Sequence, residues 1–327
     1  MIVERDGKKY LVDLASHTVR QAQPDPSDPA PAPAPAAKKQ LAKTVAAPQK
    51  APAATSNQDK TKRGVYEAGD DYLFTLPTGR RLDKHGFYVN FNHRFGFDPA
   101  FSGPARGAIL GGLDGFGIAS FGLRYGVTDK LSVSAYRSPS VIGRPIQFMA
   151  GYNLMDEHDG KPFNTTFRVS VEGRDNFRKD YTVNFEGIVS RSITKRAQIY
   201  AVPTVSLADR RLLGPQLNLT DSPPDLPGVN TFSLGVGASF DIRPTVALVA
   251  EVIPTLVNGR DLGIHRPAFS FGIQKKIWRH AFTFGFSNSP GTTVSQRAGT
   301  RATFIGDPSG DTPAALFIGF DITRQIY

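Results

Sequence analysis

The feature that most limits the fold of this chain is an alternation of apolar with small or polar residues, repeated in short segments from about residue 70 onward. In HGFYVNFNHRF, for example, Phe87, Val89 and Phe91 alternate with Tyr88 and Asn90. Successive side chains of a β-strand point to opposite faces, so each segment predicts a strand with one apolar face. Twelve segments show this character: 85–95, 115–127, 130–137, 144–154, 167–173, 181–189, 197–207, 232–242, 245–256, 267–277, 280–288 and 315–325.

Strands of this kind fit two architectures, a β-sandwich with its apolar faces inward and a membrane barrel with its apolar faces outward. The connections favour the barrel, because they tend to alternate between short turns, such as 194–196 and 243–244, and long loops, such as 98–114, 208–229 and 289–314. Outer-membrane barrels have short periplasmic turns and longer external loops. No run of 18 consecutive apolar residues predicts a membrane-spanning helix. We therefore predict an all-β protein, a transmembrane up-and-down antiparallel β-barrel of about 12 strands.

The N-terminal fifth of the chain has a different composition. Residues 1–20 form a short β-prone segment in which two runs flank Asp6-Gly7, a hairpin signal. Residues 21–54 contain 8 Pro and 12 Ala, which predicts a disordered linker that polar residues continue to 64. The barrel domain is then expected over 65–327. The first 14 residues carry charges and no apolar run, so we predict no signal peptide among them.

The charge of the chain is concentrated in this tail. The net charge is +10, and residues 1–64 hold eleven Lys/Arg against six Asp/Glu, a net of +5. We predict either a solvated linker or contact with peptidoglycan or a periplasmic protein. Nucleic acid is not a predicted partner, whereas outer-membrane lipid is the predicted surrounding of the barrel.

Four phrases resemble a bacterial family of outer-membrane β-barrels that is catalogued as a domain of unknown function. They are FTLPTGRRLDKHGFYVNFNHRF (74–95), FGLRYGVTDKLSVSAYRS (121–138), FTFGFSNSPGTTVSQ (282–296) and FIGFDITR (317–324). The resemblance covers about residues 70–327 and leaves the tail outside. It implies a barrel in the outer membrane of a Gram-negative bacterium, and it implies no substrate, cofactor or catalytic residue.

The polar faces of the expected strands carry charges of both signs, which must be paired or hydrated inside a barrel. The lumen-lining candidates are Arg94, Arg124, Arg168, Glu172, Glu186, Asp241, Glu251 and Asp321, and Lys276 has the same parity. They predict a narrow channel or binding barrel for small polar solutes. Two alternatives remain, in which the charges only hold the lumen together with salt bridges, or the barrel is a closed structural one that its tail tethers to a periplasmic partner.

Catalytic and cofactor signals are weak. The stretch SNSPGTT offers Ser287 and Ser289, but G-x-S-x-G is absent and His280 lies at the other end of the same expected strand. An outer-membrane hydrolase is therefore an alternative, and the main prediction is a protein without enzymatic activity. The glycine-rich stretch 111–117 lacks a following helix, the acidic turn 156–160 lacks calcium-loop spacing, and cysteine is absent. No metal or cofactor is predicted.

Overall fold

The computed structural model describes residues 2–5, 8–13, 18–21, 64–97, 117–138, 143–209, 228–257, 260–261, 267–289, 291–299 and 316–327. The chain divides into two compact units, 1–51 and 52–327. In the first unit, β1 (Ile2–Arg5), β2 (Lys8–Asp13) and β3 (Thr18–Gln21) form an antiparallel sheet in chain order. β1 and β2 flank the predicted Asp6-Gly7 turn. The predicted linker lies outside the described residues between 22 and 63.

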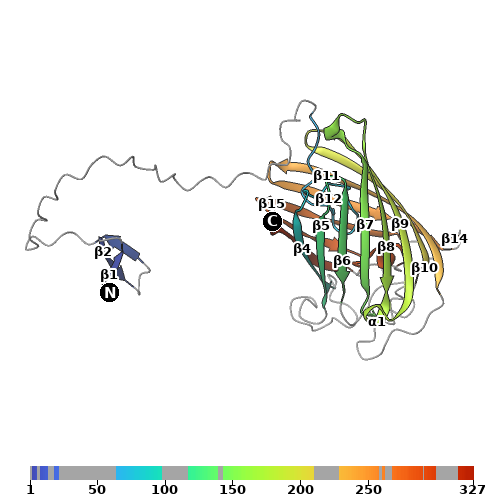
Figure 1. Cartoon of the computed structure of the whole chain (residues 1–327), viewed down its shortest axis with the longest axis horizontal. Coiled ribbons are helices and arrows are strands. Elements are labelled where there is room, and N and C mark those ends of the chain that lie inside the picture. Colours follow the sequence, from blue (N-terminus) through green and yellow to red (C-terminus); the bar gives the residue numbers. More distant parts are fainter. Residues whose placement is uncertain are drawn as a thin grey trace, which may run out of the picture. The chain divides into compact units, whose positions relative to one another are not determined.

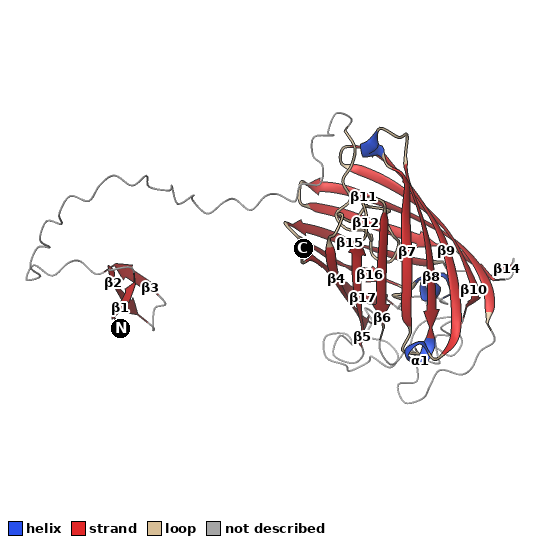
Figure 2. Ribbon diagram, in the orientation of Figure 1, coloured by secondary structure: helices blue, strands red, loops and turns tan. Residues whose placement is uncertain are grey.

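The second unit is a closed ring of twelve antiparallel strands in chain order (Figures 1 and 2). The last strand pairs with the first, Ile318 opposite Phe95 and Arg324 opposite Val89, which closes the barrel. The predicted twelve-stranded up-and-down barrel is thus confirmed. The strands are β4 (Phe87–Phe97), β5 (Gly117–Gly126), β6 (Leu131–Arg137), β7 (Ile146–Met155), β8 (Asn164–Gly173), β9 (Lys179–Thr194), β10 (Ala197–Asp209), β11 (Val229–Arg243), β12 (Val246–Ile253), β15 (Ala268–Ile277), β16 (His280–Ser287) and β17 (Leu316–Gln325).

Smaller elements lie between the strands of the ring, among them a 3-10 helix, η5 (Glu157–Asp159), in the turn between β7 and β8. Beyond β12, β13 (Thr255–Val257) continues the pairing with β11, and β14 (Arg260–Asp261) pairs with β13. A helical turn, α1 (Arg174–Phe177), follows β8 at one end of the barrel (Figure 2), and α2 (Val294–Gly299) follows β16. Among the described residues, no helix is long and apolar enough to cross a membrane.

The wall of the barrel has apolar residues outside and polar residues inside, the reverse of a water-soluble protein. On β11, Phe232 and Val236 are 42% and 45% exposed, whereas Ser233 between them is 1% exposed. Large exposed apolar side chains recur on most of the other strands, while buried Asn, Gln, Ser and Thr face inward. The parity expected for β16 holds, since Phe284 is exposed and Thr283 is buried. Such an outer surface suits lipid and not water.

Residues 64–86 are not part of this wall, although they fall within the region from 65 that was predicted to form the barrel. The wall begins at Phe87, and the preceding residues make hydrogen bonds with side chains from strands all around the ring. Their innermost part, Asp70–Thr78, doubles back on itself, because Leu73 donates to the carbonyl of Leu76 at 2.8 Å and Thr78 donates to that of Asp71 at 2.9 Å. We call Asp70–Thr78 the internal loop.

Candidate functional site

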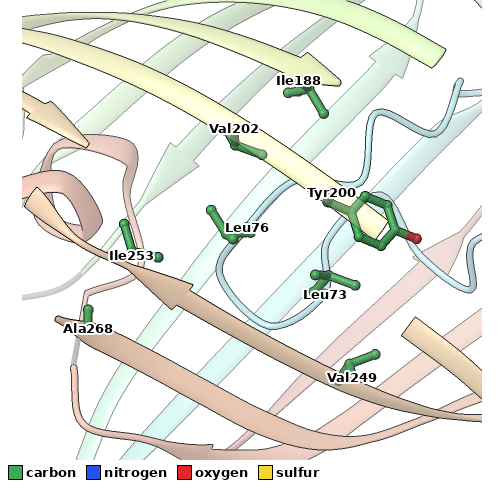
Figure 3. Packing of buried hydrophobic residues seen from close by; sticks show 8 residues of the cluster. All are labelled: Leu73, Leu76, Ile188, Tyr200, Val202, Val249, Ile253 and Ala268. Carbon is green, nitrogen blue, oxygen red and sulfur yellow. The ribbon is translucent and has the colours of Figure 1, made fainter. Parts of the chain in front are cut away.

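The tip of the internal loop packs on an apolar area of the inner wall (Figure 3). Leu73 and Leu76 are both 1% exposed, and Figure 3 shows them on the loop, facing side chains that belong to β9, β10, β12 and β15. A Cβ atom on Gly237 would lie 2.4 Å from Leu73 Cδ1, and one on Gly235 would lie 2.4 Å from Leu76 Cδ2. These two glycines therefore leave the space that the leucines occupy. The wall residues of the cluster are Ile188, Tyr200, Val202, Val249, Ile253 and Ala268.

The backbone of the loop tip binds the carboxylate of Glu251, which reaches inward from β12. The amides of Phe74, Thr75 and Leu76 donate to Glu251 at 3.2, 2.9 and 3.0 Å, and the Thr75 hydroxyl donates at 2.5 Å. Hydrogen bonds to a charged acceptor contribute about 1.5–3 kcal/mol each to stability. This carboxylate consequently holds the tip by three consecutive backbone groups.

A second contact joins the loop to the seam between β4 and β17. The Arg94 guanidinium is fully buried and lies 3.8 Å from the centre of the Phe74 ring. It donates to both carboxylate oxygens of Asp321, at 2.8 and 3.2 Å. The pair is neutral as a unit, so a charged side chain can lie against an aromatic ring inside the barrel.

The start of the loop carries two adjacent buried carboxylates. Asp71 is paired with Arg124 of β5, and Asp70 accepts a hydrogen bond of 2.6 Å from the Thr323 hydroxyl of β17. Burial and the charge of Asp71 raise the pKa of Asp70 to about 7. Burial acts in the same direction on Asp71, but the Arg124 guanidinium outweighs it and leaves the pKa of Asp71 below its ordinary value. The loop is therefore bound through one ionised and one readily protonated carboxyl group.

The side of the loop contacts a network of charges that also includes α2. Arg168 Nη2 donates to the Tyr72 hydroxyl at 2.9 Å and is paired with Glu186 at 2.9 Å. The other oxygen of Glu186 is paired with Arg297 of α2, whose Nη1 donates to the carbonyl of Thr75 at 2.8 Å. The internal loop and α2, which enter from opposite ends of the strands, thus meet at Arg297.

The base of segment 64–86 is tied to the short turns of the barrel. The Tyr66 hydroxyl donates to Asp241 at 2.9 Å, and Lys276 donates to the carbonyl of Glu67. His158, in the turn between β7 and β8, is 3.0 Å from the Glu67 carboxylate, and this hydrogen bond raises the pKa of His158. The carboxylates of the acidic turn 156–160 bind an arginine. Arg81 pairs with Asp156 at 2.5 Å and with Asp159 at 3.1 Å.

Most of the predicted inward-facing residues are thus brought together by segment 64–86, which was not predicted to lie inside the barrel. Of the eight candidates, Arg94, Arg124, Arg168, Asp241 and Glu251 contact segment 64–86 directly, and Asp321 and Glu186 hold the arginines that do so. Glu172 is also buried, but its Oε2 has no hydrogen-bond partner among the described residues. Whether these residues serve a solute remains a prediction.

Little open space is left beside the loop. Three cavities in the interior measure about 30, 40 and 20 Å³, and the first two are lined in part by Tyr72. A cavity of this size holds one or a few water molecules. The cavities beside Tyr72 are therefore too small for a solute much larger than water.

Other chemistry in the described residues is sparse. The Ser287 hydroxyl donates to the Phe269 carbonyl, and the Ser289 hydroxyl accepts from the Gly291 amide, so neither hydroxyl contacts a base there. No group of three His, Asp or Glu side chains in the described part of the chain could hold a metal ion. The predicted glycine-rich stretch 111–116 lies outside the described residues.

The sequence was also compared with known protein families. The family described as "Membrane bound beta barrel domain (DUF5777)" matches residues 71–326. The chain belongs to this family. The match begins at Asp71, so this membrane-bound barrel domain includes nearly all of the internal loop. A comparison with curated proteins found no significant match.

Solved structures with a related barrel are distant from this member of the family. The chain resembles the NanC porin, with 10% identity over 74% of this chain and 99% of the porin, at a TM-score of 0.43. It also resembles an outer-membrane channel from Pseudomonas putida F1 (11%; 80% and 100%; TM-score 0.40). The third is the outer-membrane protein Omp33 of Acinetobacter baumannii (9%; 74% and 99%; TM-score 0.39).

Sequence reasoning missed the internal loop of this barrel domain because residues 64–80 show no alternation. Two signals in the wall pointed to it. Gly235 and Gly237 place no side chain on the inner face of β11, and Ile188 is apolar although Glu186 and Ser190 are its neighbours on the same face. An apolar area inside a polar barrel needs an apolar occupant.

Proposed function

We propose that this chain is an outer-membrane channel for small polar solutes that its own internal loop holds closed. The observation that carries the proposal is the fit between loop and wall, in which Gly235 and Gly237 provide the space for Leu76 and Leu73. A permanently closed barrel could fill its interior with larger side chains of the wall itself. The two glycines instead leave space for a separate segment, the internal loop. The loop is also covalently part of segment 64–86, which leads back to the basic tail, so it can leave without unfolding a strand.

The polar inner wall supports the same proposal. With the loop withdrawn, Arg94, Arg124, Arg168, Glu186 and Glu251 would face a water-filled lumen, as in barrels that conduct solutes. The two signs of charge are nearly balanced, which favours weak ion selectivity. The proposed mechanism is diffusion through this lumen, with the internal loop as the gate.

The experiment uses a substitution that removes the space for the loop. Gly237→Val places a β-favouring side chain on the inner face, where it collides with Leu73. We expect Gly237→Val to conduct in planar bilayers at least about tenfold more often than the unaltered protein, which corresponds to a loss of about 1.4 kcal/mol of loop binding. Ala238→Val, which introduces the same side chain on the outer face of the same strand, is the control and should stay closed.

A second candidate function is a closed structural barrel. The observation that favours it is the density of contacts, since one carboxylate, Glu251, binds three consecutive amides and the cavity beside Tyr72 and Phe74 measures only about 30 Å³. In that case Gly237→Val would destabilise the protein without opening it. A variant that keeps its heat-modifiable migration on a gel and still never conducts would exclude the channel and leave the structural barrel.

A further inference from the structure

A cluster of uncharged polar side chains covers part of the inner wall on β9, β10 and β11. Asn184 lies opposite Ser206 in the register of β9 and β10, and Thr204 lies opposite Ser233 in the register of β10 and β11. Side chains directly opposite each other on one face of a sheet have their Cβ atoms about 4.5–5.5 Å apart. The four residues therefore form one continuous surface, which we call the hydroxyl patch.

The hydroxyl patch is buried and lacks partners. Asn184, Thr204, Ser206 and Ser233 are each at most 1% exposed. The Asn184 side-chain oxygen and the three hydroxyl groups have no hydrogen-bond partner among the described residues. Buried polar atoms are nearly always hydrogen-bonded in native proteins. Four unpartnered atoms on one surface indicate that the patch is built for a ligand that is not part of the chain.

The patch is covered by α2. This helix packs against β9, β10, β11 and β13, and β13 pairs with β11 through Thr255 and Ser233, which places α2 at the level of the patch. Its polar contacts are made elsewhere, since Arg297 binds Glu186 and Thr75, Ser295 hydrogen-bonds Glu172, and Gln296 accepts from the amides of its own loop. The helix thus packs on the strands that carry the patch, whose four polar atoms have no hydrogen-bond partner among the described residues.

The contact between Arg297 and Thr75 links this cover to the gate. When the internal loop withdraws, Arg297 loses the Thr75 carbonyl and keeps only Glu186. The attachment of α2 to the interior is then weaker, and the hydroxyl patch becomes accessible in the same state in which the lumen opens.

The chemistry of the patch defines the ligand. Three hydroxyl groups donate and accept, and an amide oxygen accepts, while the neighbouring charge of Glu186 is neutralised by Arg168 and Arg297. Thr231, opposite Ser206, donates to Asp209 at 3.3 Å, so this second carboxylate also has a partner. A surface of several hydroxyl groups beside carboxylates that already have partners matches a neutral solute with several hydroxyl groups of its own. We propose that the hydroxyl patch is a binding site for neutral polyhydroxylated solutes of the sugar class, which replace α2 on it. This inference rests on the proposed channel function and names its solute class.

The test measures binding and conduction separately in the Gly237→Val protein. Equilibrium dialysis of the detergent-solubilised full chain with labelled sucrose should show saturable binding. Thr204→Val and Ser233→Ala in the same background should weaken binding about fivefold each, because each removes a hydrogen-bonding group. Ser134→Ala, a matched loss of a hydroxyl on the inner face of β6, should leave sucrose binding unchanged.

Planar-bilayer recordings of the same proteins provide the second readout. Sucrose should interrupt the current of Gly237→Val at lower concentration than gluconate or glucosamine, and Thr204→Val should abolish that preference. Absence of sucrose binding in dialysis, or equal binding in Thr204→Val and Ser134→Ala, would overturn the inference even if the channel conducts. A protein that binds sucrose at the patch but never conducts would instead overturn the proposed channel and retain the site.

Discussion

Two segments occupy the interior of the barrel, and they are held in different ways. The internal loop contacts side chains from strands around the whole ring, with an apolar tip, a carboxylate that binds its backbone and two carboxyl groups of its own. By contrast, α2 is held by Arg297, which binds Glu186 and Thr75, and by Ser295, which hydrogen-bonds Glu172, and it rests on a patch whose polar atoms have no partners in the described chain. The difference indicates that the internal loop is the principal closure and α2 a lighter cover that depends on it.

The largest expected effect comes from the apolar tip. The double substitution Leu73→Ala and Leu76→Ala removes two fully buried side chains, and each such loss costs about 2–5 kcal/mol. We expect loop binding to fall by about 5 kcal/mol, enough to leave the loop mostly outside the wall cluster. Because the chain has no cysteine, maleimide labelling of Ala68→Cys reports the change. Labelling as slow as in the parent Ala68→Cys protein would show that the apolar tip does not hold the loop.

The carboxylate on β12 should have the next largest effect. Glu251→Gln keeps the shape of the side chain and removes the charge that accepts from Phe74, Thr75 and Leu76. We expect the free energy of loop binding to fall by about 2 kcal/mol, so that labelling of Ala68→Cys becomes roughly thirtyfold faster. Glu172→Gln is the matched control, since Glu172 is a buried carboxylate that hydrogen-bonds Thr293 and Ser295 and not the internal loop; an equal effect of both substitutions would refute the specific role of Glu251.

A smaller effect is expected from pH. The raised pKa of Asp70, about 7, means that the inserted loop holds this proton near neutrality, whereas the released carboxyl has an ordinary pKa and is ionised. Loop insertion is therefore favoured below pH 7 and weakens as the pH rises through 7, by about tenfold between pH 6 and pH 8. The raised pKa of His158 acts in the same direction, because its bond to Glu67 is lost as the imidazole deprotonates.

Labelling of Ala68→Cys across this range, divided at each pH by the labelling rate of the unfolded protein, measures the pH effect, because the reactive thiolate itself becomes more abundant as the pH rises. The additional substitution Asp70→Asn mimics the protonated group and should remove most of the slope, leaving the part due to His158. A slope of the opposite sign, with faster labelling at pH 6, would contradict the assignment of Asp70 as the titrating group.

The smallest effect is expected from Arg297→Gln, which tests whether α2 and the internal loop are held independently. Arg297→Gln removes the guanidinium that joins α2 to Glu186 and Thr75. Maleimide labelling of Val294→Cys, a buried position on α2, should accelerate about fivefold, equivalent to about 1 kcal/mol. Labelling of Ala68→Cys should change less than about twofold. If both positions respond equally, the two segments act as one closure and not as a plug and a cover.

The sequence predicted the wall far better than its contents, and the reason is physical. In a strand that separates lipid from a polar interior, apolar and polar residues alternate with a period of two. The outward face of Phe232 and the inward face of Ser233 can therefore be predicted from the adjacent residues alone. The internal loop obeys no period. Leu73 and Leu76 are determined by partners more than a hundred residues away, such as Val202 and Val249, and only the wall that receives them shows that they are needed. The charges were predicted to face inward, but their pairing depends on the three-dimensional arrangement of segment 64–86.

The seam between β4 and β17 has a consequence for how the protein folds. The strand that completes the wall ends two residues before the C-terminus, and it pairs with the first wall strand, more than two hundred residues earlier. Pairing over such a separation is slow, because a long chain must be ordered before the contacts that stabilise it form. Arg94 and Asp321 lie on opposite sides of this seam, and the Phe74 ring stacks on Arg94. Closing the seam and seating the loop are thus expected to be coupled late steps of assembly.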